Sequence, residues 1–252
     1  MIKSQTKDKL MQLKLNAFVE VLEEITANTS CSLSVGEALD MMVDREMVLR
    51  DNRRLVRLLK TAKLRYPSAC AINIDYHQKR QFNQELLRQL THCQWISERR
   101  NVIFTGPTGT GKSYIACAIG HQACQMSHSV RYYRVTRLIE LLRLSHADGS
   151  YNKLLERLSK IAVLILDDWG IDRLDRQGRR DLLEVLEDRY DKSSTIITTQ
   201  LPAGSWHSFI GDDTIADAVC DRIVNNAYVL EVQGESMRKI KDLTDGGQVV
   251  SS

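Results

Sequence analysis

Apolar residues recur at helical spacing along the first quarter of the chain. Their three- and four-residue intervals predict an amphipathic helix over residues 7–27. Ser34 and Glu37 then have the spacing of a capping box, in which each side chain accepts a hydrogen bond from the other residue's backbone N–H. A second helix is therefore predicted to begin there and to continue, in one or two pieces, until Pro67 ends it. We expect residues 1–66 to form a small all-helical domain.

From residue 101 onward, short apolar runs alternate with segments of helical periodicity. Five of these runs have β-strand character, over residues 101–105, 130–135, 161–166, 195–199 and 228–232. Helices are predicted between them, over 113–126, 136–145 and 177–190. Because strands that alternate with helices form parallel sheets, residues 101–240 are predicted to form an α/β domain. We interpret 67–100 as a linker with a lead-in helix near 83–93, and 241–252 as a flexible tail.

Charge is unevenly placed along a chain of ordinary composition. The 252 residues are 43% hydrophobic and 27% charged, which excludes wholesale disorder. The net charge of +3 lies in the first quarter, because residues 1–65 hold 12 Lys and Arg against 9 Asp and Glu. Four of these basic residues share one helix face, namely Arg50, Arg53, Arg54 and Arg57. A solvated face is one interpretation, but the few acidic residues nearby favour a nucleic-acid contact.

Membrane and secreted classes are not supported. No run of about 20 mostly apolar residues occurs, so no transmembrane helix is expected. No apolar run follows the charged N-terminus, as a secretory signal would require. The six Cys form no CxxC pair, so we interpret them as reduced thiols and expect a cytoplasmic protein.

The most specific pattern is a glycine-rich loop after the first predicted strand. Residues 106–113 read GPTGTGKS, the full GxxxxGK[S/T] pattern between a strand and a helix. Glycines let successive backbone N–H groups converge on a phosphate, and the helix N-terminus adds positive dipole. Lys112 is predicted to contact the β- and γ-phosphates of ATP, and Ser113 to bind Mg²⁺. The residues predicted to form the site are Gly106, Pro107, Thr108, Gly109, Thr110, Gly111, Lys112, Ser113 and Tyr114.

An acidic pair is predicted to complete the phosphate site. The apolar run over 161–166 is typical of a central parallel strand, and Asp167 and Asp168 follow it directly. We predict that Asp167 holds Mg²⁺ through water and that Asp168 orients or activates the attacking water. If the strand over 195–199 lies beside this one, Thr199 or Gln200 reaches the γ-phosphate from the side.

Two arginines near the C-terminus are further candidates. Arg238 follows the last predicted strand and is placed to touch phosphate within its own subunit. Arg222 lies on a predicted helix and is placed to reach the γ-phosphate of a neighbouring subunit. For each of them alone, an ordinary surface position is the alternative.

Several motifs together resemble one family of ATPases. The segments GPTGTGKS, LILDDWG, EDRY, STIITTQ, ADAVCDRIV and GESMRK are similar to those of the AAA+ helicase loaders and insertion-sequence helpers. The chain looks specifically like the IstB helpers that two-gene insertion sequences encode beside their transposase. The N-terminal stretch RDNRRLVRLLKTAKLR shares this resemblance, which runs from about residue 13 to 239.

The resemblance implies a fold and a set of residue roles. The family has an AAA+ P-loop core with a five-stranded parallel sheet in order 5-1-4-3-2, and it binds nucleotide between subunits. Too few residues follow Arg238 for the C-terminal helical lid of many AAA+ proteins. By motif, Lys112 and Ser113 match the phosphate and metal ligands, and Asp167 and Asp168 match the Walker B pair. Gln200 takes the position of sensor 1, Arg222 that of the arginine finger and Arg238 that of sensor 2.

The resemblance also implies a function. It implies a weak Mg²⁺-dependent ATPase that clamps target duplex DNA as a head-to-tail homo-oligomer and recruits the cognate transposase, which stimulates hydrolysis. We assign the DNA contacts to the arginine row of residues 50–57 and to Arg131, Arg134 and Arg137. Binding of the transposase by the N-terminal helices is an equal alternative.

Other functions fit parts of the same pattern. A replicative helicase loader shares the ATPase core but acts on single strands, and the N-terminal stretch argues against it. A P-loop small-molecule kinase requires an acceptor pocket and an arginine lid, which the run ADAVCDR and the basic helix do not suggest. A protein that coats DNA and uses ATP only to assemble is disfavoured by Asp168.

Overall fold

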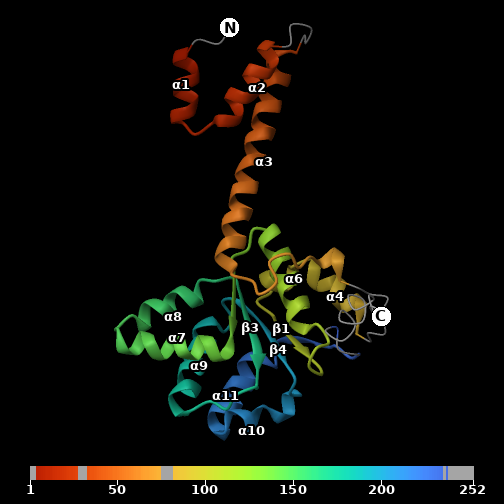
Figure 1. The fold of residues 1–252 in the computed structure, drawn as a ribbon, viewed down its shortest axis with the longest axis vertical. Helices are drawn as coiled ribbons and strands as arrows, with labels where there is room; N and C mark the ends of the chain where they lie inside the picture. The colour runs from red at the N-terminus through yellow and green to blue at the C-terminus, as the bar shows by residue number, and fades with distance from the viewer. Residues whose placement is uncertain (1–3, 28–32, 75–81, 235–236, 238–252) are drawn as a thin grey trace, which may run out of the picture. The chain divides into compact units, whose positions relative to one another are not determined.

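The structure is a computed structural model of the chain, and it describes residues 4–27, 33–74, 82–234 and 237. These residues divide into two compact units, 1–57 and 58–252. Helix α3 (Val35–Ala62) contributes residues to both units (Figure 1).

Two helices, not one, occupy the first segment, so the prediction of a single helix over 7–27 is wrong. Helix α1 (Ser4–Gln12) ends where Lys14 adopts the left-handed conformation, with φ of 59°. The N–H groups of Lys14 and Leu15 donate to the carbonyls of Met11 and Leu10, each at 2.9 Å. This is a Schellman motif without its usual glycine, so nothing in the sequence marks it. The turn lets α1 pack against α2 (Asn16–Ala27).

The capping box at the start of α3 is confirmed. Ser34 Oγ accepts a hydrogen bond from Glu37 N at 3.2 Å, and Glu37 Oε2 accepts one from Ser34 N at 2.8 Å. The helix then runs in one piece to Ala62, short of the predicted end at Pro67, because Lys63 turns left-handed with φ of 50°.

The unit of residues 58–252 is built on the predicted five-stranded parallel sheet. Its strand order, β2-β3-β4-β1-β5, is the predicted order read from the other edge. All four neighbouring pairs are parallel. The strands are β1 (Asn101–Thr105), β2 (Val130–Arg134), β3 (Val163–Trp169), β4 (Ser194–Thr199) and β5 (Ala227–Glu231).

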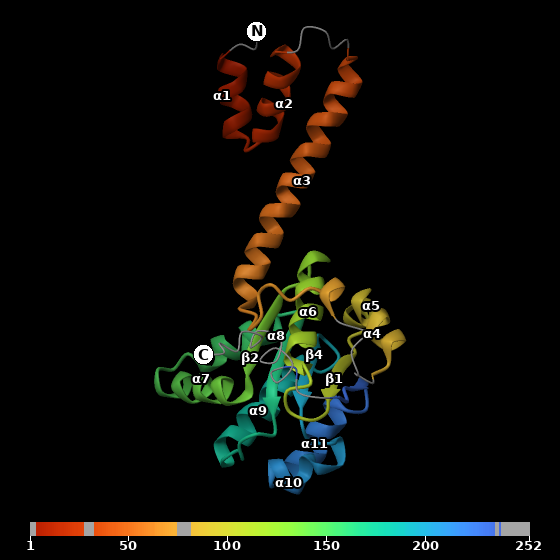
Figure 2. The same ribbon diagram turned by 45° about the vertical axis from the view of Figure 1, so that its right-hand side comes forward.

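Helices cover both faces of this sheet and form a three-layer sandwich (Figure 1, Figure 2). One face carries α6 (Lys112–Gln125), with α4 (Gln84–Thr91) packed on it. The other carries α7 (Val135–Ala147) and α9 (Arg176–Arg189), flanked by α11 (Asp213–Ile223). The four helices predicted for this unit are confirmed to within a few residues. The short elements are α5 (Gln94–Ser97), α8 (Tyr151–Ser159), α10 (Trp206–Ile210) and the 3₁₀ turns Ala71–Asn73 and Ala203–Ser205.

Alternation along β3 decides which residues face α6. Leu164 and Leu166 are fully buried in the core under α7 and α9. Ile165 points the other way, and its Cδ1 lies 2.7 Å from where a Cβ on Gly120 of α6 would be. Residue 167 therefore falls on the α6 side, beside the loop at the start of that helix.

Arg189, at the end of α9, is the most deeply buried arginine that the structure describes, at 2% exposure. It donates to the carbonyls of Leu158, Ile161 and Ser194 at 2.5–2.9 Å, and to Thr195 Oγ1 at 3.3 Å. The side chain thus ties α8 and the starts of β3 and β4 to α9.

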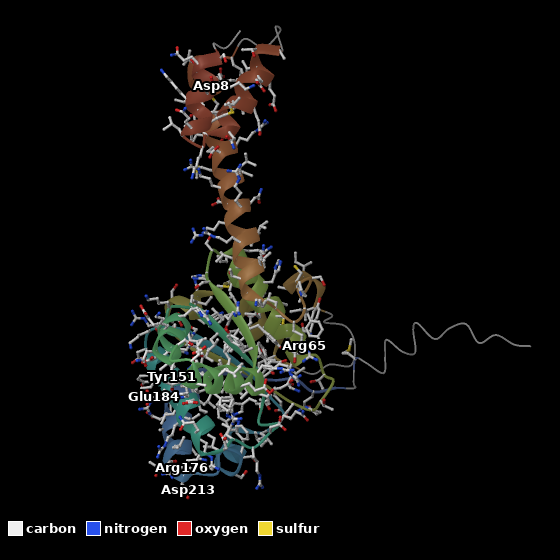
Figure 3. The ribbon with its side chains drawn as sticks, turned by 60° about the vertical axis from the view of Figure 1, so that its left-hand side comes forward. Asp8, Arg65, Tyr151, Arg176, Glu184 and Asp213 are labelled. Atoms are coloured by element: carbon white, nitrogen blue, oxygen red, sulfur yellow. The ribbon has the colours of Figure 1, made fainter. Side chains whose placement is uncertain are left out.

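Arg189→Leu is expected to lower the free energy of unfolding by about 3 kcal/mol or more, because it leaves several buried carbonyls without a donor. Denaturant unfolding measures the change. The exposed Arg176, labelled in Figure 3, provides the control Arg176→Leu, which should change stability little. Equal stabilities for the two variants would contradict the role of Arg189.

Candidate nucleotide-binding site

The predicted glycine-rich loop connects the end of β1 to the start of α6. Its first residue, Gly106, has φ of 142°, and a Cβ there would lie 2.1 Å from the carbonyl oxygen of Val232. Gly109 and Gly111 also have positive φ, of 82° and 93°. The loop backbone thus adopts conformations that side-chain-bearing residues rarely reach.

Gly106→Ala is expected to weaken ATP binding by about a hundredfold, because the loop must move by about 1 Å or more to clear Val232. Titration with a fluorescent ATP analogue measures this change. Gly149→Ala is the matched control, because Gly149 also has positive φ, of 73°, but nothing lies within 4 Å of its Cβ position. Equal affinities for the two variants would show that the close approach does not shape the loop.

Lys112 lies at the first position of α6, and only 8% of it is exposed. Its Nζ donates to the carbonyls of Gly106 and Pro107, each at 2.7 Å. Burial lowers the pKa of the ammonium group, and the charges of Asp167 and Asp168 oppose this shift. The side chain therefore lies folded over the loop, where a phosphate held by the loop would meet it.

Asp167 is fully buried and accepts four hydrogen bonds. Oδ1 accepts from Ser113 Oγ at 2.6 Å and from Thr198 Oγ1. Oδ2 accepts from Tyr132 OH at 2.5 Å and from Arg65 Nη1 at 3.2 Å. The structure thus brings together Ser113 and Asp167, the two metal ligands expected from the sequence.

Asp167 and Asp168 lie within β3, not after it as predicted, because the strand contains a β-bulge. Pairing with β4 shifts between Leu166 and Trp169, so the two aspartates together lie opposite Thr198. Asp168 adopts φ of 62°, a left-handed conformation that is uncommon for a residue with a side chain. The bulge cancels the strand alternation and turns both carboxylates toward the same site.

The partners of Asp168 support this geometry. Its Oδ2 accepts a hydrogen bond from Arg134 Nε at 2.8 Å and lies 3.8 Å from Arg65 Nη1. The same Arg65 nitrogen reaches Asp167. One guanidinium therefore faces both carboxylates.

The end of β4 lies between β3 and β1, as the sequence argument required for contact with the γ-phosphate. Thr199 Oγ1 faces away from Asp167, donates to the Trp169 carbonyl at 2.9 Å and accepts from Leu201 N. Gln200 is exposed just beyond the strand. The hydroxyl that contacts the Walker B position belongs to Thr198, which the sequence analysis did not single out.

Arg65 and Tyr132 are also additions to the predicted site. Burial, together with the neighbouring Asp167 carboxylate, raises the pKa of Tyr132, so the phenol remains a donor. Beside Arg65, the ring of Tyr66 lies 5.9 Å from that of Tyr114, a residue predicted for the nucleotide site. A short stretch of residues 64–66, far from the motifs in sequence, therefore borders the phosphate loop.

The donor set fits Mg²⁺, which prefers oxygen ligands and usually keeps several phosphate and water oxygens. Ser113 Oγ and Asp167 Oδ1 are adjacent hard ligands, 2.6 Å apart. In the part of the chain that the structure describes, no group of three or more His, Cys, Asp or Glu is placed to hold a metal. A metal held by Ser113 and Asp167 would take its other ligands from phosphate and water oxygens.

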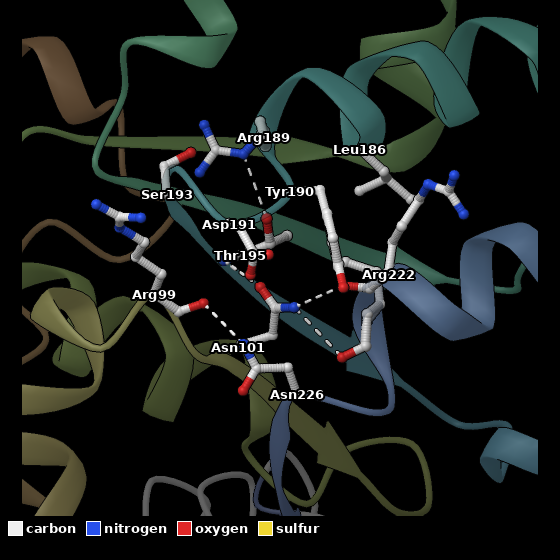
Figure 4. A pocket seen from close by; sticks show the side chains of 11 residues that line it. Arg99, Asn101, Leu186, Arg189, Tyr190, Asp191, Ser193, Thr195, Arg222 and Asn226 are labelled. Atoms are coloured by element: carbon white, nitrogen blue, oxygen red, sulfur yellow. Dashed lines mark hydrogen bonds between the residues drawn. The ribbon is translucent and has the colours of Figure 1, made fainter.

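Arg222 lies near the N-terminal end of β1, whereas the phosphate loop follows the C-terminal end of that strand. Asn101, the first residue of β1, donates from Nδ2 to the carbonyls of Arg222 and Ile223, at 3.1 and 3.3 Å (Figure 4). The loop starts beyond the other end of this five-residue strand, roughly 13 Å away at about 3.3 Å per residue. The 25% exposed Arg222 side chain borders a surface pocket, where its Nε donates to Glu187. Arg222 is thus directed away from its own phosphate loop.

The arginines expected to contact DNA differ in their surroundings. In residues 1–57, Arg50 Nε pairs with the buried Glu46 at 2.8 Å, and Arg53, Arg54 and Arg57 continue the row on α3. In the other unit, the partly buried Arg131 donates to the Thr61 carbonyl at 2.7 Å and Arg134 pairs with Asp168, whereas Arg137 is 73% exposed beside Glu140. Arg238 lies outside the described residues.

The fold and the site define the class of protein. A parallel sheet in this order, a glycine-rich loop between β1 and α6, and an acidic pair in β3 are the features of an AAA+ P-loop ATP-binding domain. The chain belongs to the family of IstB-like ATP-binding proteins, whose family model matches residues 8–244. The resemblance inferred from the motifs is confirmed.

Relatives with curated names agree with this family. A Sinorhizobium fredii protein named as an insertion sequence ATP-binding protein is 43% identical over 240 residues, covering 95% of this chain and 98% of its own. The protein named as the ATP-binding protein of insertion sequence IS1162 in Pseudomonas fluorescens is 46% identical over 206 residues, covering 81% and 89%.

Solved structures share the fold at lower identity. The DnaC helicase loader superimposes with a TM-score of 0.55 at 22% identity, over 67% of this chain and 99% of that one. DnaI gives 0.55 at 19% identity, over 71% and 92%. Among the described residues, no helix has the length and apolarity needed to cross a bilayer.

Proposed function

We propose that the protein is an Mg²⁺-dependent ATPase that assembles on target duplex DNA and recruits and stimulates the transposase of an insertion sequence. The observation that carries the proposal is the separation of Arg222 from the phosphate loop of its own chain. When the candidate arginine finger of one chain lies away from its own site, a second chain can supply the finger to that site. ATP bound between subunits then favours assembly.

Within each site, the roles follow from the contacts. Lys112 places its charge on the β- and γ-phosphates, and Thr198 holds the Asp167 carboxylate that faces Ser113. Bound Mg²⁺ would supply electrostatic stabilisation of the phosphate charge there. Asp168, turned toward the site by the bulge, orients the attacking water.

Head-to-tail contacts of this kind close into a ring or continue as an open helix. Either assembly lines up many copies of the weakly basic residues on one DNA molecule. Each phosphate contact contributes about −0.9 to the logarithmic salt slope of duplex binding, so several subunits bind tightly without reading bases. The names of the relatives, which tie them to insertion sequences, support a transposase as the protein partner.

The arginine row of α3 and the exposed Arg137 are the proposed DNA contacts. Arg131 and Arg134 would first have to release hydrogen bonds within the chain, because DNA contact would compete with their bonds to Thr61 and Asp168. The unit of residues 1–57 could bind the transposase instead of DNA. Substituting Arg53 and Arg137 separately, and measuring duplex affinity, distinguishes these possibilities.

ATP is expected to tighten binding to a random-sequence duplex by about a hundredfold, because avidity adds to each subunit's weak affinity. Fluorescence anisotropy at two salt concentrations, with duplex and single strands of equal length, measures the effect. Lys112→Ala should abolish the ATP effect, whereas Lys160→Ala, at an exposed lysine paired with Glu156, should preserve it. No ATP effect on either nucleic acid would contradict the assembly proposed here.

A helicase loader is the second candidate, and the likeness of the fold to DnaC and DnaI favours it. The same titration decides between them. A preference for single strands would support the loader and overturn the proposal of a transposition helper.

A further inference from the structure

The stretch of residues 64–66, which follows α3, is packed against the phosphate site. Leu64, 7% exposed, lies against Gly120 of α6, with its Cδ2 3.3 Å from where a Cβ of that glycine would be. Arg65 reaches both acidic residues of β3, and Tyr66 packs near Tyr114. Residues 64–66 themselves belong to no nucleotide-binding motif.

The hydrogen bonds of Asp167 fill its capacity. A carboxylate offers about four acceptor positions, and Asp167 uses them for Ser113, Thr198, Tyr132 and Arg65. A metal ion beside Ser113, or a water held by that ion, can therefore reach this carboxylate, at Oδ1 or at the Oδ2 that Arg65 contacts, only where a present donor leaves.

Arg65 is the donor that leaves most easily. Its hydrogen bond of 3.2 Å is the longest of the four. Its side chain is 34% exposed, so water can solvate the released guanidinium, whereas Thr198 is buried. It also carries a positive charge, which a divalent cation at the same carboxylate repels.

We propose that Arg65 is a positioning residue that occupies the Asp167 carboxylate in exchange with Mg²⁺, so that residues 63–66 withdraw from the site when Mg²⁺–nucleotide binds. The inference rests on the proposed nucleotide site and adds a responsive segment to it. The end of α3, just before this segment, is also bonded to the sheet, because Arg131 of β2 donates to the carbonyl of Thr61. The movement would reach the last turn of that helix.

Affinity for a fluorescent ATP analogue, measured with Mg²⁺ and with EDTA, tests the exchange. Arg65→Ala should tighten binding about fivefold in Mg²⁺, equivalent to about 1 kcal/mol, and leave binding in EDTA unchanged. Arg65→Lys, which keeps the charge but not the planar fork, should give a smaller gain. Arg88→Ala is the matched control, because Arg88 is an exposed arginine paired with Glu85 on α4. Weaker or unchanged Mg²⁺-dependent binding by Arg65→Ala would overturn the proposal.

Hydrogen exchange of the wild-type chain gives an independent readout that needs no variant. Amides of residues 63–69 should exchange faster with Mg²⁺–nucleotide than with nucleotide in EDTA. Slower or unchanged exchange would also overturn the inference. If the wild-type chain binds no nucleotide, the proposed function fails with it; if binding is Mg²⁺-dependent but Arg65→Ala is neutral, this inference alone fails.

Discussion

Arg222→Ala is expected to lower the rate of ATP hydrolysis by about a thousandfold while leaving ATP binding unchanged. The residue lies near the N-terminal end of β1, and the phosphate loop follows the other end of that strand, so its loss should not alter the site of its own chain. The deficit should appear in kcat, measured by phosphate release in the presence of DNA. Arg180→Ala, at an exposed arginine of α9, is the control and should hydrolyse ATP normally.

Mixing two inactive variants sharpens this test. Lys112→Ala is expected to lose phosphate binding but to retain Arg222, and Arg222→Ala is expected to have the reverse defect. Where a Lys112→Ala subunit supplies Arg222 to the site of an Arg222→Ala subunit, a working site should form. The mixture should therefore regain part of the hydrolysis that neither variant shows alone. A mixture as inactive as its components would argue against a site shared between chains.

Asp168→Asn is expected to lower hydrolysis by about 10² to 10⁴-fold, because the amide cannot accept a proton from the attacking water. ATP binding and ATP-dependent DNA binding should persist, so the variant should dissociate from DNA more slowly than the wild type. Single-turnover hydrolysis and dissociation after a chase with unlabelled duplex measure the two effects. Asp172→Asn, at an exposed position after β3, is the control.

Of the two measurements, the dissociation rate shows directly whether hydrolysis drives release of DNA. If Asp168→Asn releases DNA as fast as the wild type, hydrolysis does not drive release. ATP would then act only to hold the assembly together, which is the non-hydrolysing alternative.

The parts of the fold set by local pattern could be predicted from the sequence. The apolar runs located all five strands, because strands in a parallel sheet are buried on both faces. The GPTGTGKS pattern located the loop between β1 and α6, because glycines are required where the backbone adopts positive φ. The capping box at Ser34 located the start of α3 to within a residue.

Other features depend on tertiary contacts or on unusual backbone that no residue type announces. Lys14 and Asp168 are left-handed without being glycine, so neither the turn after α1 nor the bulge in β3 was predicted. Arg65 reaches Asp167 across 102 residues of sequence, and only the fold places them together. Tyr132 looked like an ordinary strand residue for the same reason.

Because Asp168 has a left-handed backbone, the stability of the fold and the activity of the site favour different residues at this position. Glycine would relax the strain that the bulge imposes there, since it accepts positive φ without penalty. The same change removes the carboxylate that the bulge delivers to the site. A search for variants with higher thermal stability would therefore tend to select glycine at residue 168, which removes the carboxylate needed for hydrolysis. A screen for stability must be paired with one for hydrolysis.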